Sequence, residues 1–249
     1  VTGGLGYIGS HTIIALLEND FEVIILDSKI NSSEKVIKRI EKLLKHIKLD
    51  RFRNLKFIFG DIKDEELMEK IFRSCQRSKK QIKAVIHYAG YKYVEKSFIC
   101  PLSFWENNVS GTISLLKIMD RNQCRTIVFS SSASIYGPSN FVPFKEKDAI
   151  SPISPYGNTK ATIEKILKDI FSYGSSKWKI ANLRYFNPIG AHSSGFIGDE
   201  PAEKSSNIFP SLLNCLDESK TFYINGSDWQ TDDGTCVRDY IHVEDVAES

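Results

Sequence analysis

The sequence predicts an α/β fold, in which a doubly wound parallel sheet carries helices on both faces and the start of a smaller domain follows. Short apolar runs alternate with longer segments whose apolar residues recur at helical spacing. This alternation is typical of parallel strands joined by crossover helices, and nearly continuous apolar strands are typical of a doubly covered sheet. A glycine-rich turn also stands between the first strand and the first helix, where such folds bind phosphate groups.

The predicted elements follow one another from the first residue. A strand stub at residues 1–2 leads through the glycine turn into a helix over residues 8–19 and a strand over 22–26. The alternation then continues with a helix over 33–48, a strand over 55–59, a helix beginning at 64–66, a strand over 84–87, a helix over 109–119, a strand over 125–130, a helix over 156–171 and a strand over 178–184.

From residue 187 the pattern changes, because Gly, Ser, Pro and Asp become frequent and long periodic runs are few. We therefore expect a Rossmann-type domain over residues 1–186 and the start of a smaller domain over residues 187–249. A segment of about residues 236–249 is expected to return to the first domain. The chain begins without Met and stops just after a helix begins, so we expect the smaller domain to be incomplete at its C-terminal end.

Composition excludes several classes of protein. The chain has 249 residues, of which 41% are hydrophobic and 26% charged, as in an ordinary globular protein. The formal net charge of +2 predicts no nucleic-acid partner. The five cysteines are scattered and form no C-x-x-C pair, which disfavours a disulfide framework or a metal site and favours a reducing, cytoplasmic location. No apolar run approaches the ~20 residues that a membrane span requires.

The glycine turn has the spacing G-x-x-G-x-x-G, formed by Gly3, Gly6 and Gly9. Glycine lets the backbone turn tightly, approach a pyrophosphate closely and pack the helix against the strand. The N-terminus of the helix then offers free N–H groups and a positive dipole to the phosphates. The turn therefore predicts a dinucleotide site.

Two acids extend this prediction. Asp27 ends the next strand, where a carboxylate accepts hydrogen bonds from ribose hydroxyls and repels the extra phosphate of NADP. The pattern favours NAD over NADP, although Lys29 stands nearby. Asp61 follows the third strand, where it contacts the adenine, caps the following helix or does both.

The spacing Y-x-x-x-K of Tyr156 and Lys160 predicts a catalytic pair. Residues four apart share one face of a helix, so the Lys160 ammonium is expected beside the phenol. An ordinary tyrosine has a pKa of ~10 and is a poor base at neutral pH, but a fixed cation favours the phenolate. Ser132 lies at the C-terminal end of a strand, where open α/β sheets bind ligands. Together with the glycine turn, these residues indicate an NAD(P)-dependent short-chain dehydrogenase/reductase.

The sequence resembles the extended short-chain dehydrogenase/reductase family over its whole length, and within it the UDP-glucose 4-epimerase family. The two stretches most diagnostic of the epimerases are residues 183–192 (LRYFNPIGAH) and residues 232–243, which contain DDGT and VRDYIHV. The other matching stretches are residues 1–12 (VTGGLGYIGSHT), 23–27 (VIILD), 60–62 (GDI), 85–92 (VIHYAGYK), 107–109 (NNV), 130–137 (SSSASIYG) and 154–157 (SPYG).

The resemblance implies the roles of individual residues. Tyr156 is the implied general base, Lys160 holds the nicotinamide ribose, and Ser132 bridges the tyrosine and the sugar. The implied NAD-binding residues are Gly3, Gly6, Tyr7, Ile8, Gly9, Asp27, Asn31, Asp61, Ile62, Tyr88, Ala89, Gly90, Lys92, Asn108, Ser130, Tyr156, Lys160 and Tyr185. The implied substrate-binding residues are Lys92, Ser132, Tyr156, Phe186, Asn187, Asn207, Tyr223 and Arg238.

The resemblance also implies a reaction, the interconversion of UDP-galactose and UDP-glucose. Tyr156 takes the proton of the 4-hydroxyl while C4 gives a hydride to NAD, the 4-keto sugar rotates, and hydride and proton return to the other face. Residues 1–186 would bind NAD and residues 187–249 would begin the UDP-sugar domain. A homodimer is implied as well, through a four-helix contact between the regions 109–119 and 156–171.

Other functions remain open. The chain is alternatively an epimerase of the same extended family that acts on a UDP-pentose, a UDP-uronate or a UDP-N-acetylhexosamine. A dehydratase is disfavoured, because Ala133 and Ser134 stand where such enzymes carry Asp-Glu. A non-catalytic NAD-binding module is disfavoured because Ser132, Tyr156 and Lys160 occur together.

Overall fold

The structure is a computed structural model that describes residues 1–138, 142–174, 177–200, 207–224 and 226–249. A π-helical segment, Trp105–Ser110, joins α5 to α6. In chain order the helices and strands are α1 (Tyr7–Glu18), β1 (Val23–Asp27), α2 (Lys35–His46), β2 (Leu55–Phe59), α3 (Glu65–Arg77), β3 (Val85–His87), α4 (Val94–Ile99), α5 (Pro101–Phe104), α6 (Gly111–Arg121), β4 (Thr126–Ser132), α7 (Pro155–Tyr173), β5 (Lys179–Tyr185), β6 (Asn187–Ile189), α8 (Ile208–Asp217), β7 (Tyr240–His242) and α9 (Val243–Glu248).

The central sheet is parallel throughout. β1 pairs with β2, and β4 lies between β3 and β5. Thr2 connects these two groups, because it forms parallel bridges to Leu26 of β1 and to His87 of β3. The strand order is therefore β2-β1-Thr2-β3-β4-β5, which is the order of a Rossmann fold with Thr2 in the place of the first strand. The predicted doubly wound parallel sheet is confirmed.

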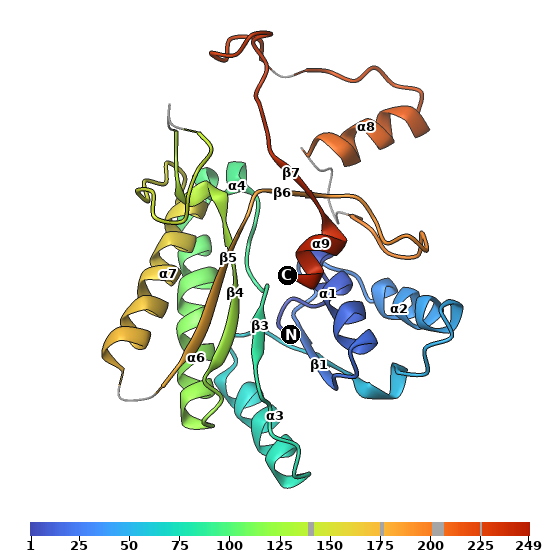
Figure 1. Ribbon diagram of the computed structural model, residues 1–249, viewed down its shortest axis with the longest axis vertical. Coiled ribbons are helices and arrows are strands. Elements are labelled where there is room, and N and C mark those ends of the chain that lie inside the picture. Colours follow the sequence, from blue (N-terminus) through green and yellow to red (C-terminus); the bar gives the residue numbers. More distant parts are fainter. Residues whose placement is uncertain (139–141, 175–176, 201–206, 225) are drawn as a thin grey trace.

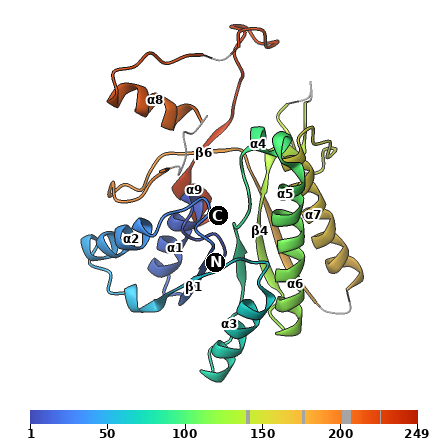
Figure 2. The same cartoon turned by 180° about the vertical axis from the view of Figure 1, so that it is seen from behind.

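Helices cover both faces of this sheet (Figures 1 and 2). Within the described ranges, buried apolar side chains form one cluster with α3, α6 and α7 and another with α1 and α2. The strand β1 contributes to both, because Leu26 packs in the first cluster while Val23 and Ile25 pack in the second. This alternation follows from the period of two in a strand.

The segment after β5 forms a small parallel pair of its own. β6 pairs with β7, with Asn187 opposite Tyr240. The following helix α9 packs against α1, while α8 lies apart from the sheet in both views (Figures 1 and 2). Residues 240–248 therefore lead back to the helix that follows the glycine turn. The division of the chain at residue 187 remains a prediction.

Candidate active site

A large cavity of about 2160 Å³ lies at the C-terminal ends of the strands. Its walls come from the glycine turn, from the ends of β1, β3 and β4, from the start of α7 and from the segments after β5. Parallel sheets bind ligands at this edge. Pockets for one drug-sized ligand occupy about 300–1,000 Å³, so this cavity has room for two ligands of nucleotide size.

Nearly all the residues singled out from the sequence line this one cavity, and the exception is Asn108. The lining residues among them are Gly3, Gly6, Tyr7, Ile8, Gly9, Asp27, Asn31, Asp61, Ile62, Tyr88, Ala89, Gly90, Lys92, Ser130, Ser132, Tyr156, Lys160, Tyr185, Phe186, Asn187, Asn207, Tyr223 and Arg238.

The three glycines of the turn have different surroundings. Gly3 has a φ of +68°, and a Cβ there would lie 2.7 Å from the backbone nitrogen of Ala89. A Cβ on Gly9 would lie 2.5 Å from the carbonyl oxygen of Gly3. A Cβ on Gly6 would meet only that same oxygen, at 3.3 Å, so it would extend into the cavity. Gly3 and Gly9 thus permit the close packing of the turn, whereas Gly6 leaves space for a ligand.

Asp27 has a buried carboxylate, 7% exposed, that is fixed by the chain. Its Oδ1 accepts hydrogen bonds from the Lys29 amide at 2.8 Å and from the Ser32 hydroxyl at 2.7 Å. Its Oδ2 accepts one bond, from the Leu5 amide at 2.9 Å. Because a carboxylate oxygen accepts two bonds, Oδ2 retains a lone pair for a further donor such as a ribose hydroxyl.

Asp61 does not cap the helix that follows it. The cap of α3 is Asp64, whose side chain accepts a hydrogen bond from the Leu67 amide. Asp61 accepts a bond from the Lys63 amide at 2.8 Å and lines the cavity. Of the two interpretations drawn from the sequence, the helix cap is wrong and the ligand contact remains.

Asn108 lies behind the cavity wall, 2% exposed. Its amide nitrogen donates to the carbonyl of Tyr91 at 3.1 Å and to the hydroxyl of Thr159 at 3.2 Å. Its oxygen accepts from the amide of Tyr91 at 2.8 Å and from the side chain of Asn107 at 3.0 Å. These bonds use the full capacity of the amide. Asn108 therefore holds the wall segment after β3 against α7, and the structure does not present its side chain to the cavity.

The hydroxyl of Ser132 lies against the phenol of Tyr156. Ser132 Oγ accepts from the Ser134 amide at 3.2 Å and from the Ser134 hydroxyl at 3.0 Å. Its own proton is then available for Tyr156, and this hydrogen bond favours the phenolate. Burial has the larger effect, so the pKa of Tyr156 is raised above its ordinary value. Before a ligand binds, Tyr156 is therefore a neutral phenol.

Lys160 is buried one turn further along α7, with its ammonium beside the ring of Tyr156. Its Nζ donates to the carbonyl of Ser130 at 2.7 Å and lies 5.8 Å from the centre of the Tyr156 ring. Burial lowers the pKa of Lys160 to about 8. The ammonium is held over the ring rather than at the phenol oxygen, so the chain alone does not produce the lowered tyrosine pKa that the sequence suggested.

A buried ion pair supports the strand that carries these serines. Glu164, on α7, accepts a hydrogen bond from the Ser131 hydroxyl at 2.5 Å. The guanidinium of Arg184, on β5, binds the same carboxylate through two nitrogens, at 3.0 and 2.7 Å. A bidentate pair of this kind fixes geometry as well as charge. It therefore fixes Ser131. This residue stands between Ser130, whose carbonyl accepts a hydrogen bond from Lys160, and Ser132, whose hydroxyl lies against the phenol of Tyr156.

Most of the predicted substrate-binding residues within residues 187–249 are exposed. Arg238 is exposed and its Nη1 donates to the carbonyl of Val237 at 2.9 Å. Across the part of the chain that the structure describes, no acid forms an ion pair with Arg238. Asn187 donates to the carbonyl of Asp239 at 2.8 Å, which joins β6 to the residues before β7.

Sequence reasoning missed one wall of the cavity. Ile197, Gly198, Asp199 and Glu200 line it together with Arg39 of α2. The sequence offers Gly195 and Gly198 as a turn signal, but no pattern indicates that this turn packs on α2.

Within the described ranges, no group of His, Cys, Asp and Glu has the geometry of a metal site. No helix among the same residues is long and apolar enough to span a membrane.

A family model described as the NAD dependent epimerase/dehydratase family matches residues 1–249 of this chain. The chain is 43% identical over 249 residues to UDP-glucose 4-epimerase 4 of Oryza sativa subsp. japonica, and the match covers 100% of this chain and 65% of the rice protein. The chain thus spans about two thirds of the length of that relative.

Two solved structures are similar as well. They are UDP-glucose-4-epimerase from Stenotrophomonas maltophila with bound NAD and formylated UDP-arabinopyranose, and UDP-glucose 4-epimerase from Bifidobacterium longum in complex with NAD+ and UDP. Each is 38% identical with a TM-score of 0.89, and each match covers 99% of this chain and 70% of the other.

Proposed function

Because this chain belongs to the NAD dependent epimerase/dehydratase family, we propose that it binds NAD and interconverts UDP-galactose and UDP-glucose by inverting the hydroxyl at C4. The observation that carries the proposal is the position of Ser132, Tyr156 and Lys160 in the same cavity as the glycine turn and Asp27. The similarity to the rice enzyme supports the same reaction.

The residues at one end of the cavity fit NAD. Gly6 leaves room for a pyrophosphate at the N-terminus of α1, where free N–H groups and the helix dipole favour an anion. The unused lone pair on Asp27 Oδ2 suits a ribose hydroxyl. When bound, NAD supplies a hydride acceptor for C4 of the sugar and a positive charge close to the phenol.

Tyr156 moves the proton. Its neutral phenol needs a second cation before it ionises, because burial raises its pKa and Lys160 lies over the ring. Ser132 donates to the phenol oxygen and so stabilises the phenolate that removes the proton of the 4-hydroxyl. Lys160 is held by the Ser130 carbonyl, which leaves its remaining N–H groups for ribose hydroxyls.

Residues 187–249 would hold the UDP moiety. The exposed guanidinium of Arg238 matches a diphosphate, which it can bind through two nitrogens. Asn187, Asn207 and Tyr223 line the same cavity. A UDP-pentose is a second candidate substrate, because the Stenotrophomonas maltophila structure holds formylated UDP-arabinopyranose.

The chain is also proposed to act as a cytoplasmic homodimer that contacts its copy through α6 and α7. The five cysteines lie within the described residues and all are free thiols, as a reducing compartment requires. Apolar side chains exposed on α4, α5 and α7 support the contact between copies.

The test of the reaction is to incubate the protein with UDP-galactose and no added NAD. We expect UDP-glucose to form, because the cofactor returns to its starting state in each cycle and stays bound. Tyr156→Phe is expected to lower the rate by at least about a hundredfold, in the range of lost general-base catalysis. Tyr173→Phe is the matched control, since Tyr173 ends the same helix and is 85% exposed.

Two results would contradict the proposal. A Tyr156→Phe protein with full activity would remove the assigned base. A folded protein that contains NAD but converts no UDP-hexose would move the assignment to another UDP-sugar, and a panel of pentose, uronate and N-acetylated substrates would identify it.

A further inference from the structure

Residues 190–200 form a hairpin that we call the strap. The strap doubles back on itself, with an antiparallel bridge between Ala191 and Gly198 and a hydrogen bond of 3.0 Å from the His192 amide to the Ile197 carbonyl. In both views of the fold it follows β6 and extends over α1 toward α2 (Figures 1 and 2). Its last residues, 197–200, form part of the cavity wall.

The far end of the strap is anchored on α2. Ile197 is 3% exposed and belongs to the apolar cluster of α1 and α2. The ring of Phe196 meets the ring of His46 edge to face, with centroids 5.4 Å apart. Arg39 and Glu200 form an ion pair between α2 and the end of the strap. The strap is therefore held against α2, and residues 197–200 line the same cavity as Arg39 of α2 and Asp27.

The near end is anchored on the glycine turn. The hydroxyl of Tyr7 donates to the Gly190 carbonyl at 2.6 Å. Gly190 has a φ of +92°, and a Cβ there would lie 2.3 Å from Nε2 of His242. A side chain at this position would displace the imidazole, so the first residue of the strap is packed directly against the last residue of β7.

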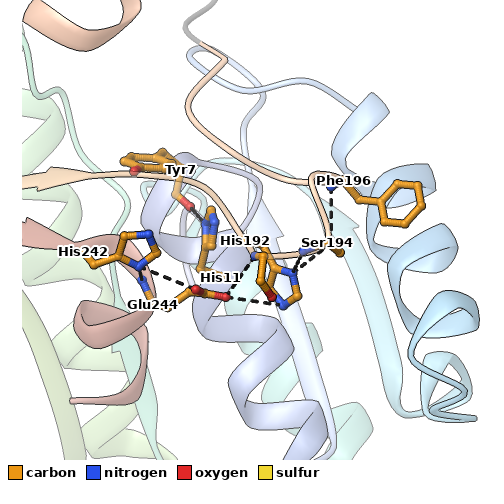
Figure 3. Close-up of polar contacts among 8 residues, drawn as sticks. Tyr7, His11, His192, Ser194, Phe196, His242 and Glu244 are labelled. Atoms are coloured by element: carbon orange, nitrogen blue, oxygen red, sulfur yellow. Dashed lines mark hydrogen bonds and ion pairs between the residues drawn. The ribbon is translucent and has the colours of Figure 1, made fainter.

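Glu244 joins the strap to α9 (Figure 3). Its Oε1 lies 3.7 Å from Nε2 of His192 and accepts a hydrogen bond of 3.4 Å from the Ser193 amide. Its Oε2 lies 3.6 Å from Nδ1 of His242. The His192 ring carries its proton on Nε2, facing Glu244, because Nδ1 accepts from the Ser194 amide at 3.1 Å. Nδ1 of His242 accepts a hydrogen bond of 3.3 Å from the Glu244 amide, so Glu244 contacts the strap through its carboxylate and β7 through its backbone.

His11 is a neutral side chain next to the contact between Glu244 and His192. Its Nδ1 donates to the Tyr7 carbonyl at 2.8 Å, so its other nitrogen, Nε2, is unprotonated. That nitrogen is buried and has no hydrogen-bond partner among the described residues. Burial lowers the pKa of His11. The ring lies 6.5 Å from the ring of His192, and since it stays neutral it leaves the charge of Glu244 available to the strap.

We propose that the strap retains the bound dinucleotide and that Glu244 acts as a positioning residue that keeps the strap closed. This inference rests on the proposed binding of NAD. The adenosine end of the dinucleotide, beside Asp27, lies behind the wall formed by residues 197–200, and it leaves only when the strap lifts from α2 or from α9. A reaction that returns its cofactor unchanged needs no exchange of the cofactor between cycles, so slow dissociation of NAD does not limit turnover.

The experiment measures how fast bound NAD leaves. The protein is loaded with radiolabelled NAD and chased with unlabelled NAD, in the native form and in Glu244→Ala and Phe196→Ala. Neither residue lines the cavity. Glu244 belongs to α9, whereas Phe196 packs against His46 of α2, so the two variants loosen different contacts of the strap. Glu248→Ala is the matched control, because Glu248 is exposed on the same helix and makes no ion pair within the described residues.

We expect dissociation about tenfold faster in Glu244→Ala and in Phe196→Ala, and an unchanged rate in Glu248→Ala. The turnover number at saturating NAD should stay within about twofold of native, since a structural defect at the active site would lower it as well. Native dissociation rates in both strap variants, with melting curves that show them folded, would overturn the inference. A native protein that contains no NAD after purification and takes up no labelled NAD would instead refute the proposed function, and the inference with it.

Discussion

At the scale of single residues, the ammonium of Lys160 lies where its charge is disfavoured. The side chain is 5% exposed, and burial lowers its pKa from 10.5 to about 8. Below pH 8 the folded and the unfolded chain both carry the proton, so the folded chain bears the full cost of the buried charge. Between about pH 8 and 10.5 the unfolded chain alone holds the proton, and stability contributed by this group rises with pH.

Lys160→Met should therefore separate stability from activity. At pH 7 we expect the variant to be at least as stable as the native protein, because it avoids a cost of up to about 3 kcal/mol. Epimerase activity should be lost, since the ribose contact and the cation are removed. Urea unfolding at pH 7 and at pH 9.5 checks this, and the native protein should gain stability relative to the variant at the higher pH. A variant several kcal/mol less stable at pH 7 would contradict the argument.

His87 is a second buried titratable residue, and its hydrogen bonds define its neutral tautomer. Thr112 Oγ1 donates to the Asn108 carbonyl at 2.5 Å, so it accepts from Nε2 of His87 at 2.9 Å. The other nitrogen, Nδ1, then accepts from the Thr2 hydroxyl at 2.7 Å. Burial lowers the pKa of His87 to about 3. His87, the last residue of β3, is therefore a neutral core residue.

The protonation of His87 predicts a loss of stability in weak acid. Below pH 6.5 the unfolded chain binds a proton that the folded chain does not, so the free energy of unfolding falls as the pH is lowered. From pH 7 to pH 5 this group should cost the native protein about 2 kcal/mol. His87→Gln keeps a donor for Thr112 but does not titrate. The difference in unfolding free energy between native and variant should shrink by that amount over this range, and a constant difference would exclude the mechanism.

At the scale of elements, the glycine turn requires glycine for two different reasons, close packing at Gly3 and space for a ligand at Gly6. Gly3→Ala would place a Cβ at a positive φ and against the backbone of Ala89, so we expect a loss of at least about 2 kcal/mol of stability. Gly6 has an extended backbone with a φ of −74°, and its Cβ would extend into the cavity. Gly6→Ala should fold with nearly native stability and bind NAD at least about tenfold more weakly.

Thermal melts and NAD titrations of both variants distinguish these effects. Each variant serves as the control for the other, because the same methyl group is added three residues apart in one turn. Equal loss of stability in both would mean that Gly6 is also required for packing, and the assignment of its open side to a pyrophosphate would fail.

The predicted elements agree with the structure where apolar periodicity is strong. The helix over residues 33–48 is found as Lys35–His46 and the strand over 55–59 as Leu55–Phe59. Two short helices, Val94–Ile99 and Pro101–Phe104, were not predicted. They are shorter than the window in which a helical period can be recognised, and Ile99 and Leu102 on them are exposed although apolar. The helix expected at residue 109 begins at Gly111, because a π-helical segment precedes it.

Side-chain direction set the limit of site prediction. A motif places Asn108 next to the cavity, but whether its amide faces a ligand or the chain depends on contacts with Tyr91 and Thr159. The strap was missed for a related reason. Its position follows from contacts with α1, α2 and α9, which are distant in the sequence, and none of these contacts has a local pattern. The pair β6–β7 is equally long-range, since it joins Asn187 to Tyr240.

At the scale of the whole molecule, the doubly wound parallel sheet was predictable because strands and helices alternate along the chain. The alternation, the continuous apolar strands and the glycine turn predict a Rossmann-type domain, and the order of its strands comes from the structure. After residue 187 long periodic runs are few in the sequence, so this pattern does not apply. The arrangement of these residues depends on long-range contacts, such as the pairing of β6 with β7 and the packing of α9 on α1.

The exposed apolar side chains of α4, α5 and α7 bear on assembly. Ile99 and Leu102 are 82% and 81% exposed, and Phe171 and Tyr173 at the end of α7 are 64% and 85% exposed. The short helices α4 and α5 both pack against α7, and in Figure 2 α5 and α6 follow one another along one line beside α7. Large exposed apolar side chains on neighbouring helices are typical of a protein interface. They support the proposed homodimer through the surface that includes α6 and α7.

Leu102→Glu is the substitution that tests this assembly. A twofold interface contains each residue twice, so the variant would bury two unpaired carboxylates, and we expect the dimer to dissociate at least about a hundredfold more readily. Leu216→Glu is the matched control, because Leu216 is 74% exposed on α8, away from α5, α6 and α7. Sedimentation velocity of the three proteins at micromolar concentration should show a dimer for the native protein and the control and a monomer for Leu102→Glu. A native protein that sediments as a monomer, or a Leu102→Glu protein that remains a dimer, would place the contact elsewhere or remove it.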